Sequence, residues 1–133
     1  MKIVLDTNVL VSGLINPRGV PVKILNLILN EKLIVLYDNR IIREYEAVLK
    51  RKKFGFAKET IDPLIDFIKH QGRFIAADPL QIKFEDEDDK MFFEVAKSGE
   101  AKYLITGNRV HFPNEPFIVT PKEFIEIDGI SLR

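Results

Sequence analysis

The chain has 133 residues, is 46% hydrophobic, and balances 20 Lys and Arg against 20 Asp and Glu, so its net charge is zero. This length and composition predict one folded domain over residues 1–133, and the neutral charge excludes a polycation that binds nucleic acid by bulk charge alone. The absence of Cys excludes disulfides, thiol catalysis and Cys-ligated zinc, and two His are too few for a His-rich metal site.

The sequence also bears on where the protein works. No apolar run approaches the ~20 residues of a membrane span, and Asp6 interrupts the apolar N-terminal run that a signal peptide would need. We therefore expect a cytoplasmic protein without membrane contact, in which carboxylates carry any acid or metal chemistry.

Short apolar runs alternate with helical segments along the chain. In chain order, the pattern predicts a strand at 3–5, helices at 9–15 and 21–32, a strand at 33–37, helices at 39–53 and 58–71, a strand at 73–76, a helix at 88–98, strands at 103–106 and 117–119, and a short helix from Pro121. Runs without polar alternation are typical of strands buried on both faces. We therefore expect an α/β fold, a three-layer α/β/α sandwich on a parallel sheet of about five short strands.

Polar residues follow two of these strands directly. Asp6-Thr7-Asn8 follows the first strand and Thr106-Gly107-Asn108 follows the fourth. Ligands of parallel sheets bind beyond the carboxyl ends of the strands, so both segments should lie at one edge. Asp6 could also serve only to cap the following helix, and the sequence alone leaves both roles open.

Two further acids are candidates for the same edge. Glu44 lies on the border of the buried stripe of its predicted helix, although a solvated surface Glu is the plainer interpretation. Residues 85–89 are five consecutive acids, a pattern typical of a solvated loop that caps a helix. Asp89 precedes Phe93 by four residues and Ala96 by seven, so it shares their stripe and we expect it to face the crevice.

Carboxylates that converge on one edge repel each other and take up protons unless a cation keeps them ionised. Ligands that are all oxygen favour Mg²⁺ or Mn²⁺ over zinc. Sites of this kind commonly serve phosphate chemistry, because the ion activates a water and stabilises the leaving oxygen.

These segments together resemble the PIN domain, in particular the toxin nucleases of VapBC-type toxin–antitoxin pairs. The resemblance runs from Ile3 to about Ile127. It rests on Asp6-Thr7-Asn8, on Glu44, on the Asp-x-x-Phe-x-x-x-Ala segment that Asp89 begins, and on Tyr103-Leu104-Ile105-Thr106-Gly107-Asn108.

The resemblance implies an endoribonuclease that depends on Mg²⁺ or Mn²⁺ and leaves a 5′-phosphate and a free 3′-hydroxyl. The implied catalytic and metal-binding residues are Asp6, Glu44 and Asp89, with Asn8, Thr106 and Asn108 in support. It also implies a homodimer and a small antitoxin protein that blocks the crevice. The apolar richness of residues 20–29 and 61–68 agrees with such contacts.

Asn108 departs from the family pattern, because many relatives carry a fourth acid there. We therefore expect one ion to bind the free protein and a second to enter only with RNA, unless Asp86 or Asp88 assists. His111 follows closely and is interpreted as a packing or hydrogen-bonding residue near the crevice.

A basic approach for RNA lies in residues 39–53, where six basic side chains outnumber two acidic ones. Its last four residues, Lys50-Arg51-Lys52-Lys53, could grip phosphates or form a solvated helix end that the helix dipole favours.

Two other functions stay open. The first is a catalytically weak or inactive PIN domain that binds RNA or a protein without cutting. The second is a phosphatase with Asp6 as nucleophile, as in haloacid-dehalogenase-like enzymes. Those enzymes place a second Asp where this chain has Asn8, which disfavours the phosphatase.

Overall fold

A sheet of five parallel strands forms the centre of the molecule in this computed structural model, which describes residues 1–129. The strands are β1 (Lys2–Leu5), β2 (Ile34–Tyr37), β3 (Arg73–Phe74), β4 (Tyr103–Ile105) and β5 (Ile118–Val119). They lie in the order β3-β2-β1-β4-β5, and each neighbouring pair is parallel. The predicted parallel α/β fold is confirmed, while residues 130–133 of the predicted domain lie outside the described residues.

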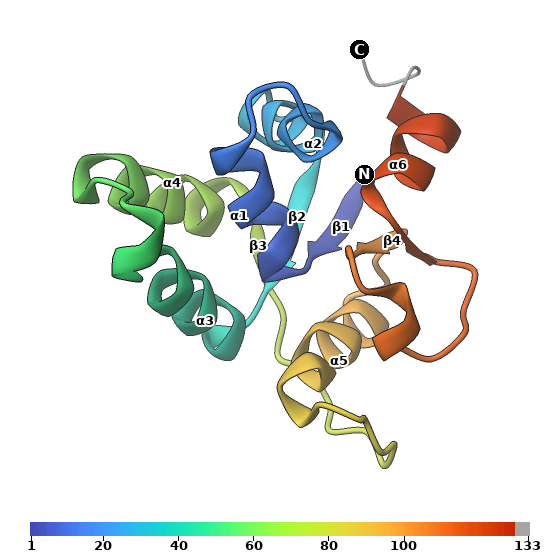
Figure 1. Cartoon of the computed structure of the whole chain (residues 1–133). Helices are drawn as coiled ribbons and strands as arrows, with labels where there is room; N and C mark the ends of the chain where they lie inside the picture. Colours follow the sequence, from blue (N-terminus) through green and yellow to red (C-terminus); the bar gives the residue numbers. More distant parts are fainter. Residues whose placement is uncertain (130–133) are drawn as a thin grey trace.

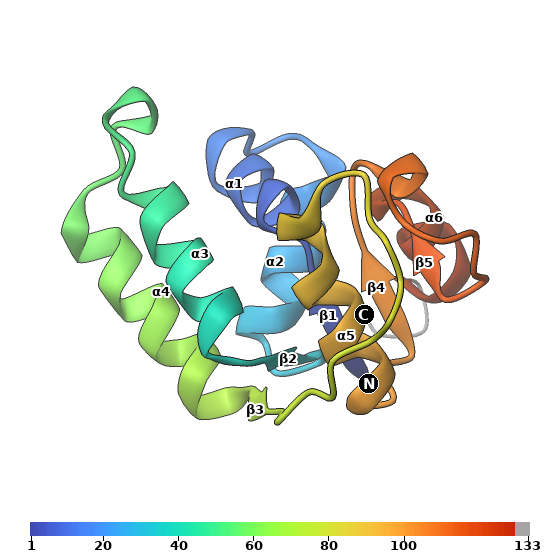
Figure 2. The same ribbon diagram turned by 90° about the horizontal axis from the view of Figure 1, so that it is seen from below.

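Helices cover both faces of the sheet. They are α1 (Thr7–Ile15), α2 (Val20–Leu29), α3 (Asn39–Leu49), α4 (Lys58–Gln71), α5 (Lys90–Ser98) and the short α6 (Pro121–Phe124). Helix α5 packs on β1, β2 and β4, and α4 packs on β2 and β3. Figure 1 places α1 and α2 on the opposite side of the sheet from α5, and in the turned view of Figure 2 α5 lies in front of the central strands.

The central strand β1 is buried on both faces, as its unbroken apolar run predicts. Ile3 and Val4 are completely buried. Tyr45 of α3 is also completely buried, and its hydroxyl donates a hydrogen bond of 2.5 Å to the carbonyl of Leu5. This bond ties α3 to the carboxyl end of β1 and so fixes the neighbouring residue, Glu44, beside that end.

Some element boundaries differ from the predicted ones. Helix α3 ends at Leu49, and a 3₁₀ helix at Lys52–Phe54 follows in place of the predicted extension to residue 53. If the helix continued, its next turn would point Lys52 toward the core, where burying an unpaired charge costs free energy. The turn closes at Gly55, whose φ of 67° is the left-handed conformation that glycine adopts without strain.

The acidic segment also differs in detail. Residues Glu87–Asp89 form a 3₁₀ turn, and α5 begins only at Lys90. Asp86 caps this turn, because its carboxylate accepts a hydrogen bond of 3.0 Å from the backbone N–H of Asp88. Among the described residues, no helix is both long and apolar enough to cross a bilayer.

Candidate functional site

Asp6 lies at the carboxyl end of β1, and Thr106 lies at the same end of the neighbouring strand β4. The Thr106 hydroxyl donates a hydrogen bond of 2.7 Å to Oδ2 of Asp6, and Asp6 is only 4% exposed. Asp6 occupies the cap position of α1, but its side chain makes no capping hydrogen bond. The backbone N–H groups of Thr7 and Asn8 nonetheless lie near enough to lower the pKa of this carboxyl, so both roles that the sequence leaves open remain.

Burial raises the pKa of the Asp6 carboxyl above its ordinary value, while the hydroxyl of Thr106, the backbone N–H groups of Thr7 and Asn8 and the charge of His111 act in the opposite direction. Because the net shift is upward, these contacts do not fully replace the hydration that the carboxylate loses on burial. Ionised Asp6 is therefore short of positive charge.

Glu44 lies beside Asp6 because Thr7, the residue that follows Asp6, holds it there. The hydroxyl of Thr7, which is 2% exposed, donates a hydrogen bond of 2.9 Å to Oε2 of Glu44. Glu44 is half-buried on α3, so the predicted position at the border of the buried stripe is confirmed. Thr7 and Glu44 are 37 residues apart, and no local pattern in the sequence marks them as partners.

Asp89 completes the group at the start of α5. Burial raises the pKa of its carboxyl to about 6, the negative charges of Asp6, Asp86 and Glu44 add to the shift, and His111 opposes it. The Nδ1 atom of His111 lies 3.7 Å from Oδ2 of Asp89. Asp6, Glu44 and Asp89 therefore lie close enough to repel one another, as expected from the sequence.

The donors fit a hard divalent cation in their chemistry. All are carboxylate oxygens, and their burial and mutual repulsion leave negative charge that a cation would relieve. Within residues 1–129, no group of three or more His, Cys, Asp and Glu side chains is already arranged to hold a metal ion. The role of these acids as metal ligands stays a prediction.

The supporting residues differ in how near they lie to Asp6. The backbone N–H of Asn108 donates a hydrogen bond of 3.0 Å to the Thr106 hydroxyl, which in turn bonds Asp6. Asn108 is half-buried, whereas Asn8 is exposed on α1. The backbone of Asn108 is thus linked to the acidic group through Thr106, and its uncharged side chain adds no negative charge.

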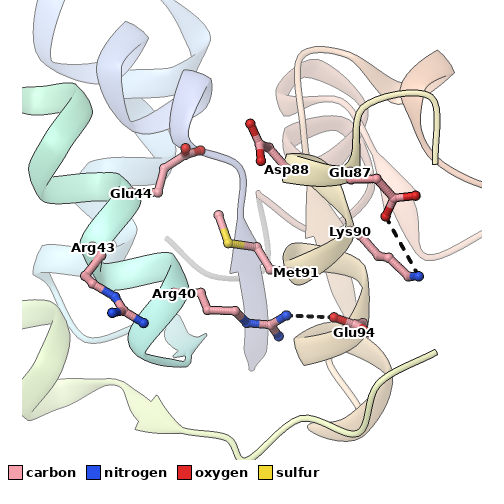
Figure 3. A pocket seen from close by; sticks show the side chains of 8 residues that line it. All are labelled: Arg40, Arg43, Glu44, Glu87, Asp88, Lys90, Met91 and Glu94. Atoms are coloured by element: carbon pink, nitrogen blue, oxygen red, sulfur yellow. Dashed lines mark hydrogen bonds and ion pairs between the residues drawn. The ribbon is translucent and has the colours of Figure 1, made fainter. Parts of the chain in front are cut away.

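A groove of about 500 Å³ opens between α3 and α5, and of the three candidate acids Glu44 lines it. It is lined by Arg40, Arg43, Glu44, Glu87, Asp88, Lys90, Met91 and Glu94. Figure 3 shows Glu44 and Asp88 facing each other at one end of the groove and Arg40 bound to Glu94 at the other. Asp88, which the sequence offered only as an alternative acid, therefore lines the groove next to Glu44.

An ion-pair network closes the far end of the groove. Arg40 contacts Glu94 at 2.8 Å and Asp38 at 2.7 Å. Glu94 is only 5% exposed, and its second oxygen accepts a hydrogen bond from the backbone N–H of Leu80. The network joins α3, which carries Glu44, to α5, which follows Asp89. The sequence did not predict this network. The feature that could have indicated it is Glu94, an acid among the apolar buried residues of α5.

The chain combines a parallel α/β sheet with acids at the carboxyl end of its central strand. These two features together characterise a class of nuclease-type domains. The family model described as PIN domain matches residues 2–110, and the chain belongs to the PIN domain family, whose fold is of the nuclease type. The chain is also similar to the uncharacterized protein MJ1680 of Methanocaldococcus jannaschii, at 32% identity over 145 aligned residues that cover 95% of this chain and 90% of the relative. No solved structure matches. The resemblance to the PIN domain is thus confirmed.

Proposed function

We propose that the protein is an endoribonuclease that uses Mg²⁺ or Mn²⁺ held by Asp6, Glu44 and Asp89. The observation that carries the proposal is the placement of these acids at the carboxyl end of β1, where Thr106 holds Asp6 and Thr7 holds Glu44. Burial raises the pKa of Asp89, and this acid lies near enough to Asp6 and Glu44 that their charges add to the rise. Membership of the PIN domain family supports a nuclease. Carboxylates in such a group favour a divalent ion over a free proton at neutral pH.

The residues of the chain would act around that ion in distinct ways. When bound, a divalent ion supplies an activated water and positive charge for the phosphate and leaving oxygens. Thr106 orients Asp6 and Thr7 orients Glu44, each through a hydroxyl that donates to the carboxylate. The Arg40 network fixes the spacing of α3 and α5 and hence the width of the groove that would receive RNA.

A cluster of basic residues at the end of α3 supports RNA as substrate. Lys50 is partly neutralised, since it lies 3.7 Å from Asp62, and Lys53 lies over the ring of Phe54. Arg51 and Lys52 are exposed and make no ion pair with any residue that the structure describes. These two cations are therefore available for phosphates at the end of α3.

We extend the proposal to a toxin that forms a homodimer and is blocked by a small antitoxin. An apolar groove of about 350 Å³ supports a protein partner; it is lined by Leu14, Leu25, Leu29, Thr60, Pro63, Leu64 and Phe67. Most apolar residues of α2 and α4 are already buried within the chain, and the groove adds the exposed Leu29 and the half-buried Phe67. An antitoxin Arg or Lys would neutralise the acids. Sedimentation showing only monomer at micromolar concentration would contradict the dimer.

The experiment that tests the nuclease is a Mg²⁺ and Mn²⁺ titration with a fluorogenic single-stranded RNA. We expect cleavage that EDTA abolishes and that Asp6→Asn removes. The alternative, a PIN domain that binds RNA or a protein without cutting, is favoured by the uncharged Asn108. Tight binding of RNA with no cleavage at any metal concentration would establish that alternative and refute the nuclease.

A further inference from the structure

A second hollow, of about 420 Å³, adjoins the groove between α3 and α5, which we call the acidic groove. Arg43 lines both spaces. Its lining is Tyr37, Asn39, Ile42, Arg43, Lys69 and Phe74. These residues come from the ends of β2 and β3, the first turns of α3 and the last turn of α4. Because Arg43 lines both spaces, the hollow continues the path that a strand of substrate would follow out of the groove.

Phe74 presents an open aromatic surface in this hollow. It lies on the edge strand β3 and is 52% exposed. Tyr37 contacts it edge to face with ring centroids 6.2 Å apart, and Tyr37 is itself fixed by a hydrogen bond from its hydroxyl to the carbonyl of Lys69. The Phe74 ring is thus supported from one side and free to stack on the other.

The hollow also carries positive charge that no acid neutralises. Arg43 and Lys69 are exposed, and neither pairs with an acid in the part of the chain that the structure describes. The Nε atom of Arg43 donates only a long hydrogen bond, 3.3 Å, to the carbonyl of Asn39. Arg40, one turn earlier, is by contrast held by two acids.

An exposed aromatic ring that shares a hollow with two unpaired cations matches the chemistry of an unpaired nucleotide. Bases stack on aromatic rings whatever their sequence, and cations bind the flanking phosphates. The bases of an A-form duplex are stacked on each other and are not available for such a contact. An acidic protein segment would use the cations but gains little from the ring.

We propose that this hollow is a subsite for one unpaired base of an RNA strand whose cleaved bond lies in the acidic groove. Phe74 stacks on the base, and Arg43 and Lys69 bind the phosphates on either side. The inference rests on the proposed function and adds to it a binding subsite for one base, outside the groove in which cleavage is proposed.

The test measures binding and not cleavage, so that it does not depend on catalysis. Fluorescence anisotropy of a labelled single-stranded RNA is recorded in EDTA with wild type, Phe74→Ala, Phe74→Tyr and the control Ile127→Ala, which truncates an exposed apolar residue of a distant turn. We expect Phe74→Ala to weaken binding roughly 5- to 100-fold, Phe74→Tyr to restore it, and the control to leave it unchanged. Arg43→Gln should reduce the salt dependence of binding by about one counterion.

The outcomes separate this inference from the proposed function. Binding that depends on Phe74, together with no cleavage in Mg²⁺, keeps the subsite and refutes the nuclease. Cleavage in Mg²⁺ together with equal binding by wild type and a folded Phe74→Ala overturns the subsite. An equal loss of affinity for single-stranded and duplex RNA overturns the stacking role of Phe74.

Discussion

The hydroxyl of Thr106 donates to the carboxylate of Asp6 across 100 residues of sequence, with both side chains shielded from water. The bond joins the carboxyl ends of two neighbouring parallel strands, β1 and β4. Because Thr106 also accepts the backbone N–H of Asn108, the hydroxyl is oriented and its proton is directed at Asp6. Asp6 therefore keeps one oxygen in a fixed position while burial disfavours its charge.

Replacing Asp6 separates its chemical role from a structural one. Asp6→Asn keeps the size of the side chain and an oxygen that Thr106 can bond, but it removes a charge that burial disfavours. We expect metal-dependent cleavage to be lost, while the thermal unfolding temperature without metal is unchanged or slightly higher. Asp66→Asn, at an exposed position of α4, is the matched control and should alter neither. A large loss of metal-free stability would instead give Asp6 a structural role.

The hydrogen bond from Thr7 to Glu44 makes a second prediction. Thr7→Val keeps the shape of this buried side chain but removes the donor, so Glu44 loses the contact that orients it. Partners of this kind are worth about 10- to 100-fold in metal affinity or activity. We expect the Mg²⁺ concentration for half-maximal cleavage to rise by roughly that factor, and Thr7→Ser to restore it. An unchanged Mg²⁺ dependence in Thr7→Val would mean that Glu44 is positioned without this bond.

The pairing of Asp6 with Thr106 could be anticipated from the sequence because local rules sufficed. An unbroken apolar run predicts a buried parallel strand, and the residue after such a strand lies at the ligand edge of the sheet. Glu44 and Asp89 were proposed for that edge on weaker grounds, from the buried stripes of their helices and from the resemblance to the PIN domain. Helix α3, in contrast, was predicted too long, because Lys and Arg are good helix formers and nothing local marks an end at Leu49. The helix ends there because a further turn would bring the charged Lys52 toward the core.

Contacts between distant elements were beyond the sequence. Arg40 and Glu94 are 54 residues apart, and nothing local marks them as partners. Their pairing depends on how α3 and α5 are set around the sheet, which periodicity does not specify. Phe74 was predicted inside a longer strand, whereas β3 is only two residues long and leaves its ring exposed.

The Arg40 network should matter for stability as well as for the groove. Arg40→Gln leaves the buried carboxylates of Asp38 and Glu94 without their cation, which costs several kcal/mol when such a pair is fully buried. Because Arg40 itself is half-open to solvent, we expect a loss of about 1–3 kcal/mol in the free energy of unfolding, measured with urea. Arg18→Gln, in an exposed turn, is the control. The double variant Arg40→Gln with Glu94→Gln should lose less than Arg40→Gln alone, since one orphaned charge is gone.

Asp89 should make metal-free stability depend on pH. Its pKa is about 6 in the folded protein against an ordinary 3.8, so the folded state holds the proton more tightly than the unfolded chain. The free energy of unfolding therefore falls as the pH rises from about 4 to about 6, and the raised pKa of Asp6 acts in the same direction. Asp89→Asn should be more stable than wild type at pH 7 by on the order of 1–3 kcal/mol, with little difference near pH 4.

The same variant provides its own check with metal. Mg²⁺ should raise the unfolding temperature of wild type at pH 7, because it binds the ionised acids of the folded state only. In Asp89→Asn this stabilisation should be small. If metal-free Asp89→Asn is no more stable than wild type at pH 7, the pKa of Asp89 is not raised in the folded protein.

Asn108 sets the number of ions that the free protein can hold. Its backbone N–H donates to Thr106, whose hydroxyl donates to Asp6, and we expect a carboxylate at this position to lie close enough to add to the charge of the group. Asp6, Glu44 and Asp89 supply three negative charges, which one divalent ion nearly neutralises and which two would exceed until substrate phosphate arrives. Asn108→Asp adds a fourth charge and should tighten the binding of a second ion, measured by calorimetry with Mn²⁺ in the absence of RNA. Wild type that already binds two Mn²⁺ with similar affinity would contradict this account of Asn108 and would indicate that Asp88, across the groove from Glu44, supplies the missing charge.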